Sequence, residues 1–460
     1  MQRKVYKKLL EWDKKANRKP LILMGARQVG KTWLMDEFAR NEYAGNTVAV
    51  NLMKNELLRA RFDTLNLDAD SVIDAIQLAT GRRIVPGKTL LLIDEIQEAP
   101  RALTALKYLE EEKPGLAVMV AGSLLGLAVR RDDESDDQEV AERSDGRKAS
   151  YPVGKVEYLD VAPMTFEEYL WALGEDVKAE YIAAGRWQAL EGIHEELTDL
   201  VRRYYLVGGM PEVVKAYAEN RDFSEVRNIQ KRILRDYDED FAKHAKPRLL
   251  AKIRLLWNSV PAQLAKENKK FIYTALRPGA RAREYEVALA WLRDAGLVRM
   301  VANVNAPMMP LKAHEEFGDF KLYVHDVGLL AAMCDVPSAI LLGKTDVFTF
   351  FKGALVEQYV LEELTALGIN PYYWSPDNAK AEIEFLVQGD REVYPLEAKA
   401  EVNLRAASLK SYYNRYAPSF ELRVSMQKHT SGDRIEDIPL YGIPSILPLL
   451  RNGRQVHACD

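Results

Sequence analysis

A run of eight residues near the start of the chain has the composition and spacing that phosphate binding needs. Residues 25–32 read GARQVGKT, a full match to the pattern G-x-x-x-x-G-K-[ST]. Glycines let the backbone curl so that successive N–H groups point at a phosphate, and a helix that begins there adds its positive end. We expect Lys31 to reach the β- and γ-phosphates of a nucleotide and Thr32 to bind Mg²⁺. The residues expected to bind the nucleotide are Gly25, Ala26, Arg27, Gln28, Val29, Gly30, Lys31 and Thr32.

Two adjacent carboxylates follow an apolar run further along the chain, where residues 89–95 read TLLLIDE. A strand buried on both faces of a parallel sheet is apolar throughout, and its carboxyl end faces the crevice where ligands bind. We expect Asp94 to hold Mg²⁺ and Glu95 to polarise the attacking water, as in the Walker B pattern. A strand end followed by a solvated acid is the alternative, but here the pattern accompanies a phosphate-binding loop.

A third apolar run, AVMVAGS at residues 117–123, ends in a small polar side chain. In additional-strand ATPases such a position carries the polar sensor of the γ-phosphate, so Ser123 is our candidate for that role. The alternative is that Ser123 caps the helix that follows. The expected catalytic residues are therefore Lys31, Glu95 and Ser123.

The elements around these residues predict an α/β fold. The apolar residues 20–24 read as a strand before the loop, and Trp33, Leu34 and Phe38 follow it at helical spacing. Residues 47–52 read as a further strand. Together these runs predict a P-loop parallel sheet.

Five segments, GARQVGKT, LLLIDEIQEAP, VAGSLLG, PVGKVEYLDVAPMTFEEYL and VGGMPEVV, occur in this order. In this respect the chain resembles bacterial and archaeal AAA-type ATPases that are fused to a C-terminal domain of unknown function. The resemblance covers nearly the whole chain. It implies ATP and Mg²⁺ as cofactors, ATP hydrolysis and a cytoplasmic location. We expect an ATPase core at residues 1–160 and a helical lid at residues 161–225.

The middle segment, residues 226–335, has the order expected of a winged-helix-like domain. Tyr285, Ala288, Leu289 and Leu292 give one apolar helix face, and a strand follows from Leu297. Residues 270–273 read as a short strand. Such domains bind DNA or serve only for packing, and both alternatives stay open. The basic residues expected at the start of the recognition helix are Lys269, Lys270, Arg277, Arg281 and Arg283.

Residues 340–430 carry acidic residues and a lysine with the spacing E…E-x₁₂-E-x-K, formed by Glu357, Glu384, Glu397 and Lys399. This spacing resembles the PD-(D/E)xK nuclease-like core, in which carboxylates on adjacent strands hold Mg²⁺ or Mn²⁺ and the lysine orients water. Glu384 stands where such cores usually have aspartate, and its longer side chain would shift a metal. A degenerate nuclease fold used for binding or assembly is the alternative. Residues 431–460 are expected to form a C-terminal extension.

Composition sets the remaining limits. The chain has 460 residues, a formal net charge of −4 and only two cysteines, which excludes a disulfide framework and a cysteine zinc site. The length favours several domains. We find no signal peptide and no apolar run long enough for a membrane span.

The leading hypothesis is an ATP-binding ATPase that acts as a switch or motor for attached winged-helix and nuclease-like domains. One alternative is an ATP-dependent DNA nuclease. Another is a non-enzymatic ATP-gated switch that presents a surface to a protein partner. A homo-oligomer is compatible with each of them, and the sequence identifies no arginine finger.

Overall fold

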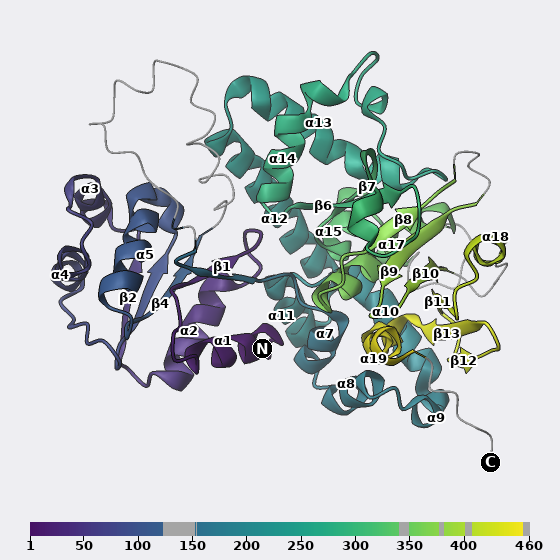
Figure 1. Ribbon diagram of the computed structural model, residues 1–460, viewed down its shortest axis with the longest axis horizontal. Helices are drawn as coiled ribbons and strands as arrows, with labels where there is room; N and C mark the ends of the chain where they lie inside the picture. The colour runs from purple at the N-terminus through teal and green to yellow at the C-terminus, as the bar shows by residue number, and fades with distance from the viewer. Residues whose placement is uncertain (123–151, 153, 340–348, 377–380, 401–406, 454–460) are drawn as a thin grey trace. The chain divides into compact units, whose positions relative to one another are not determined.

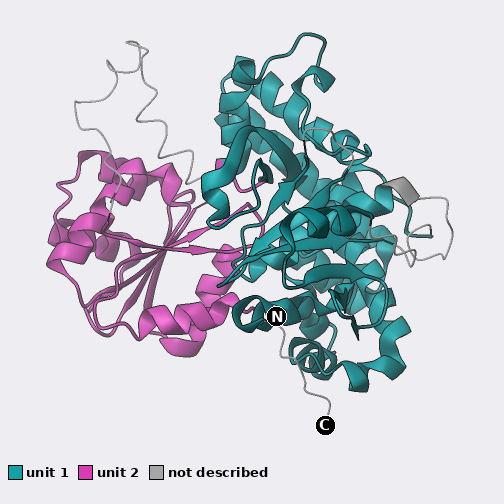
Figure 2. Ribbon diagram, turned by 45° about the vertical axis from the view of Figure 1, so that its right-hand side comes forward, with its two compact units in different colours: residues 1, 163–293, 298–460 teal, residues 2–162, 294–297 magenta. Residues whose placement is uncertain are grey.

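The computed structural model describes residues 1–122, 152, 154–339, 349–376, 381–400 and 407–453. The chain divides into two compact units, which Figure 2 distinguishes by colour. One, here called the nucleotide unit, contains residues 2–162 and 294–297. The other, here called the C-terminal unit, contains residue 1, residues 163–293 and residues 298–460.

The nucleotide unit is built on a five-stranded sheet in which every described pairing is parallel. Its strand order is β2-β3-β4-β1-β5, so β4 lies between the strand that precedes the predicted loop and the strand that ends in Asp94. The strands are β1 (Leu21–Met24), β2 (Thr47–Asn51), β3 (Leu90–Asp94), β4 (Ala117–Ala121) and β5 (Glu157–Asp160).

Apolar side chains on both faces explain why this sheet is sandwiched between helices (Figure 1). One face, which includes Ile22, Val50 and Val120, packs in a cluster with residues of α3, α4 and α5. Helix α2 contacts β3 and β4. The helices of this unit are α1 (Val5–Asp13), α2 (Lys31–Glu42), α3 (Glu56–Thr64), α4 (Ala69–Thr80) and α5 (Pro100–Glu112), with the 3₁₀ turn η1 (Ile96–Glu98).

The C-terminal unit begins with a run of helices. They are α7 (Phe166–Ala172), α8 (Asp176–Ala183), α9 (Trp187–Leu190), α10 (His194–Val207), α11 (Pro211–Asn220), α12 (Phe223–His244), α13 (Pro247–Leu264) and α14 (Glu286–Asp294). Later in the chain come α15 (Val327–Met333), α17 (Thr349–Ala366), α18 (Ala407–Tyr416) and α19 (Ile446–Asn452). Short 3₁₀ turns are η2 (Glu191–Ile193), η3 (Tyr273–Ala275), η4 (Ala282–Glu284), η5 (Leu311–His314) and η7 (Leu440–Ser445).

An eight-stranded mixed sheet organises the rest of this unit, in the order β12-β13-β11-β10-β9-β8-β6-β7. The hairpin of β6 and β7 joins it through a single parallel pairing, Asn303 with Tyr373 of β8. The expected boundary at residue 430 falls inside this sheet, because β13 pairs in parallel with β11. The strands are β6 (Val298–Val304), β7 (Glu315–Val324), β8 (Tyr372–Trp374), β9 (Ile383–Gln388), β10 (Val393–Ala398), β11 (Glu421–Ser425), β12 (Thr430–Ser431) and β13 (Ile435–Pro439).

The predicted α/β class with a parallel P-loop-type sheet is confirmed, and two local predictions are wrong. Residues 270–273 do not form a strand, because only an isolated bridge links Lys270 to Lys321. The helix expected to have a basic start begins at Glu286, so Arg281 and Arg283 precede it. The sequence pattern did not reveal this start because η4, which precedes α14, continues the helix-like spacing toward the N-terminus. Among the described residues, no helix is both long and apolar enough to cross a membrane.

Candidate nucleotide site and carboxylate cluster

The predicted phosphate-binding loop connects β1 to the first residue of α2. Gly25 has a φ of 140° and Gly30 a φ of 92°, a region that side chains disfavour. A Cβ atom on Gly25 would lie 2.2 Å from the carbonyl oxygen of Val161, so only glycine fits there. Gly30 is the N-cap of α2 and has no side chain to cap the helix. The free N–H groups of the first turn are therefore available to an anion.

Lys31 is folded back over this loop. Its Nζ atom donates to the carbonyl oxygens of Gly25 at 2.8 Å and Ala26 at 2.7 Å. Only 8% of the residue is exposed, and burial lowers its pKa to about 8, although the nearby Glu95 and Asp94 oppose that shift. A buried ammonium held by two neutral carbonyls lacks a close counter-charge. A phosphate would supply one.

Asp94 lies where Mg²⁺ is expected. Its Oδ2 atom accepts hydrogen bonds from Oγ1 of Thr32 at 3.1 Å and from Nδ2 of Asn51 at 3.2 Å. Burial and the neighbouring Glu95 raise the pKa of Asp94, and the hydrogen bonds from Thr32 and Asn51 partly offset this. A carboxylate and a hydroxyl are oxygen ligands of the kind Mg²⁺ takes. Thr32, Asp94 and the loop therefore fit an Mg–nucleotide complex, which would supply the charged phosphates that Lys31 lacks.

Asn51 is a residue that sequence reasoning missed. It ends β2, and β2 pairs with β3 so that Asn51 lies directly beside Asp94. The only indication of its role in the sequence is that it is a polar residue next to the end of the predicted strand 47–52. Its amide holds one oxygen of Asp94 and so orients the carboxylate toward the loop.

Glu95 has an unusual backbone conformation, with a φ of 55° and a ψ of 45°. This left-handed geometry costs a non-glycine residue roughly 1 kcal/mol, and strained residues of this kind are found at active sites as well as at turns. The Oε2 atom of Glu95 accepts a hydrogen bond of 2.5 Å from Nε2 of Gln97. Ser123, the third expected catalytic residue, lies outside the described residues.

The second predicted site is in the C-terminal unit. Helix α17 carries Glu357, β9 carries Glu384, and Glu397 lies near the end of β10. Lys399 brings two of these carboxylates together, because its Nζ atom lies 2.9 Å from Oε1 of Glu397 and 3.7 Å from Oε1 of Glu384. Glu357 does not contact Lys399. It pairs instead with Lys269 and, at 3.6 Å, with Lys321.

The electrostatics of these glutamates differ. Burial raises the pKa of Glu384 to about 7, although Lys399 opposes the shift. Burial acts in the same direction on Glu357, but Lys269 and Lys321 outweigh it and hold the pKa at about 2. Sequence reasoning missed Lys321 as a site residue altogether, and it assigned Lys269 only to a nucleic-acid surface. Both precede the nuclease-like segment in the chain.

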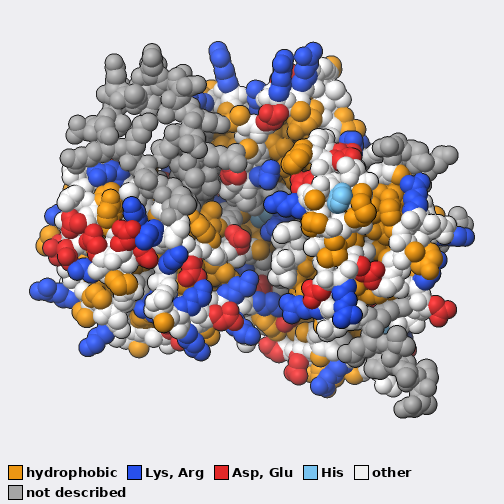
Figure 3. All heavy atoms as spheres, in the orientation of Figure 1, with side chains coloured by type: hydrophobic (Ala, Val, Ile, Leu, Met, Phe, Trp, Pro, Cys, Tyr) orange, Lys and Arg blue, Asp and Glu red, His pale blue; other side chains and the backbone are white. Residues whose placement is uncertain are grey.

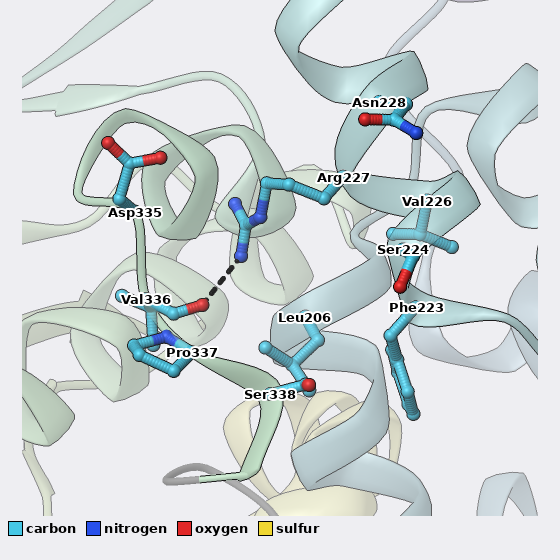
Figure 4. Close-up of a pocket in the computed structure, with 10 residues that line it drawn as sticks. All are labelled: Leu206, Phe223, Ser224, Val226, Arg227, Asn228, Asp335, Val336, Pro337 and Ser338. Atoms are coloured by element: carbon cyan, nitrogen blue, oxygen red, sulfur yellow. Dashed lines mark hydrogen bonds between the residues drawn. The ribbon is translucent and has the colours of Figure 1, made fainter.

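A hollow of about 380 Å³ lies elsewhere in the C-terminal unit (Figure 4). Arg227 reaches across it and donates from Nη2 to the carbonyl oxygen of Val336 at 2.8 Å. Helix α12 and the segment after α15 supply most of the lining. None of the predicted site residues lines it; the lining is Leu206, Phe223, Ser224, Val226, Arg227, Asn228, Asp335, Val336, Pro337 and Ser338.

Comparisons with known families match three consecutive parts of the chain. Residues 17–170 are similar to a family described as an AAA domain, which includes every residue of the predicted nucleotide site. Residues 198–339 and residues 352–446 each match a family described as a domain of unknown function. No curated protein matches the chain. The AAA match supports an AAA-type ATPase, and it leaves the C-terminal carboxylates without an assigned role.

Solved structures resemble the chain at low identity. A Walker-type ATPase of Pyrococcus abyssi has 14% identity and a TM-score of 0.42, over 73% of this chain and 95% of that one. The ORC1 protein of Aeropyrum pernix, in complex with DNA, has 12% identity and a TM-score of 0.30, over 74% and 93%. A signal-transduction ATPase from Pyrococcus horikoshii, with a tetratricopeptide repeat sensor, has 14% identity and a TM-score of 0.26, over 80% of this chain and 50% of that one.

Proposed function

We propose that this protein binds ATP with Mg²⁺ in the nucleotide unit and hydrolyses it. The observation that carries the proposal is the meeting of Thr32 with Asp94 at 3.1 Å, beside a loop whose lysine lacks a close anion. Lys31 would stabilise charge on the transferred phosphate, and Glu95 would orient the attacking water. Cytoplasmic ATP is the proposed substrate. A sensor role for Ser123 stays a prediction.

Steady-state release of phosphate from Mg-ATP tests this proposal. Lys31→Ala should lower turnover about 100-fold or more, because one preorganised electrostatic contact to the transferred group has at least that effect. Lys88→Ala is a matched control, since Lys88 is an exposed lysine of the same unit. Parent protein without turnover, or Lys31→Ala with the parent's rate, would contradict the ATPase assignment.

We further propose that the nucleotide state acts as a switch for the C-terminal unit and that this unit contacts DNA. The order α13, η3, η4, α14, β6 and β7 supports a winged-helix-like segment. Basic side chains gather at the top of the view in Figure 3, over the part where Figure 1 draws α13. Arg281 and Arg283 are exposed.

Fluorescence anisotropy with a labelled duplex, measured over a range of salt concentrations, tests DNA contact. Phosphate contacts release counter-ions, so affinity should fall steeply as salt rises. A double variant with Arg281→Ala and Arg283→Ala should reduce the salt slope by about two and weaken binding, while Lys88→Ala should leave both unchanged. Binding insensitive to salt, or absent, would remove DNA from the proposal and leave a protein partner or a second copy of the chain.

The alternative of an ATP-dependent nuclease is not favoured by the contacts of Glu357. In the predicted nuclease-like site Glu357 would accompany Glu384 and Glu397, but Glu357 is held by lysines instead. Plasmid and oligonucleotide substrates should therefore stay intact with Mg²⁺ or Mn²⁺, with or without ATP. Cleavage that Lys399→Ala abolishes would restore the nuclease alternative.

A further inference from the structure

Lys321 is a lysine without any exposed surface, and it lies within a group of glutamates. Its Nζ atom is 2.6 Å from Oε1 of Glu382 and 3.6 Å from Oε2 of Glu357, and its side chain is 0% exposed. The same atom lies 5.0 Å from the ring centre of Tyr373, a cation–π distance. A buried ammonium persists only with counter-charges, and here two carboxylates provide them.

Both oxygens of Glu357 are occupied by side chains of this chain. Lys269 pairs with Oε1, and the hydroxyl of Tyr323 donates to Oε2 at 2.9 Å. Tyr323 and Lys321 are two residues apart on β7 and so point to the same face of the sheet, where α17 presents Glu357. Glu357, the helix carboxylate of the predicted nuclease-like site, therefore has three partners within the chain, and two of them are cationic.

The remaining two carboxylates of the predicted nuclease-like site are Glu384 and Glu397. Lys399 lies beside both Glu384 and Glu397, and one buried oxygen of each, Oε2, has no hydrogen-bond partner. Those two oxygens are the place where a divalent ion would have to bind. Within the described parts of the chain, no three His, Cys, Asp or Glu residues come together in a way that could hold a metal. Lys399 already supplies positive charge to Glu384 and Glu397, as Lys269 and Lys321 do to Glu357, so these glutamates do not need the charge of the ion that a nuclease-like core implies.

The carboxylate cluster consists of Glu357, Glu382, Glu384 and Glu397. We propose that Lys321 and Lys269 serve as its built-in cations and make it independent of divalent metal. Lys269 lies between α13 and η3 and Lys321 lies on β7, whereas Glu357 and Glu382 belong to the segment after α15. The ion pairs therefore bind the hairpin to α17 at the place where β6 pairs with β8. The cluster fastens two segments of the C-terminal unit together.

The direction of the pKa shifts agrees with this arrangement. Burial opposes the charged form of Lys321, yet Glu357 and Glu382 outweigh it and raise its pKa above the usual lysine value. Glu357 is held at about 2 by Lys269 and Lys321 against the effect of its burial. Both partners therefore stay charged across the physiological range.

Mn²⁺ titration of the full chain, followed by the electron paramagnetic resonance signal of the free ion, tests the proposal without altering the lysines. We expect the parent and Glu384→Gln to bind the same number of Mn²⁺ ions. Any ion at Thr32 and Asp94 would appear equally in both, which keeps this test separate from the ATPase proposal. One additional ion in the parent, lost in Glu384→Gln, would overturn the proposal.

A double-mutant cycle tests whether the ion pair of Lys321 and Glu357 stabilises the contact between the two segments. Lys321→Met should lower Tm by about 10 °C, because it leaves Glu357 and Glu382 buried with less compensation. Lys312→Met is the control on the same hairpin region, since Lys312 is exposed, and it should leave Tm unchanged. Adding Glu357→Gln to Lys321→Met should lower Tm by less than the sum of the two single changes. Additive losses, or a Lys321→Met protein as stable as Lys312→Met, would overturn the proposal; the Mn²⁺ result decides if Lys321→Met does not fold.

Discussion

Two buried lysines of this protein differ in what surrounds them. Lys31 is held by neutral carbonyls, and burial lowers its pKa to about 8. Lys321 is also buried, but adjacent glutamates raise its pKa. A lysine that lacks a full counter-charge is suited to an anionic ligand, whereas one that is already neutralised is suited to structure. Both sites contain a buried lysine, so residue type does not distinguish them. The surroundings of the lysine do distinguish the proposed phosphate site from the carboxylate cluster.

The backbone of Glu95 leads to a prediction at the same scale. Because its φ is 55°, Glu95→Gly should be more stable than Glu95→Ala by about 1 kcal/mol, the reverse of the usual order of these residues outside the left-handed region. Both variants lose the carboxylate and its contact with Gln97, so the comparison isolates the backbone. Urea unfolding of the two variants measures the difference. Equal stability, or a more stable alanine variant, would show that the conformation is not strained.

Elements in the C-terminal unit meet at the break between α10 and α11. Gly208 and Gly209 lie there, and the N–H of Gly209 donates to Oδ2 of Asp326 at 2.6 Å. A Cβ atom on Gly209 would lie 2.0 Å from the carbonyl oxygen of Met164. Asp326 also caps α15 by accepting from the N–H of Leu329. The glycine pair thus allows the junction between α10 and α11 to share one buried carboxylate with α15 while Met164 packs directly against Gly209.

Gly209→Ala should therefore destabilise the C-terminal unit by on the order of 3 kcal/mol or more, because backbone atoms on both sides cannot move independently. Gly192→Ala is the matched control, since a Cβ atom there has no neighbour within 4 Å and the φ is not positive. Thermal unfolding followed by circular dichroism compares them. A Gly209→Ala protein with the Tm of Gly192→Ala would mean that this junction is looser than the contacts indicate.

The sequence predicted the features that contiguous residues specify, and it did not predict contacts between elements that are distant in the chain. The loop from Gly25 to Thr32 and the strand ending in Asp94 are contiguous patterns, and their elements lie within one or two residues of the expected ranges. The partners of Glu357 could not be found this way. Lys321 reaches it only because β7 lies beside α17, and no local pattern specifies that packing. Asn51 was missed for a similar reason, since its role depends on the pairing of β2 with β3.

At the scale of the whole molecule, the β6–β7 hairpin is part of the eight-stranded sheet of the C-terminal unit. Winged-helix-like and nuclease-like segments were expected as separate domains, yet β6 pairs with β8 and one sheet passes through both. Lys321 and Lys269 add ion pairs across the same junction. Under the proposed switch, the C-terminal unit would therefore respond as one body rather than as two modules moving apart.

Glu384 and Glu357 should change the pH dependence of stability in opposite directions. The folded pKa of Glu384 is raised to about 7, so the folded chain binds more protons than the unfolded chain between about pH 4.5 and 7, and stability falls as pH rises through that window. The folded pKa of Glu357 is lowered to about 2, so its contribution is present above about pH 4.5 and is lost as pH falls toward 2. Relative to the parent, Glu384→Gln should gain Tm from pH 4.5 to 7, while Glu357→Gln should regain Tm as pH falls below 4.5. Differential scanning calorimetry over that range measures both differences; parallel profiles for the two variants would mean that the lysines do not distinguish these glutamates.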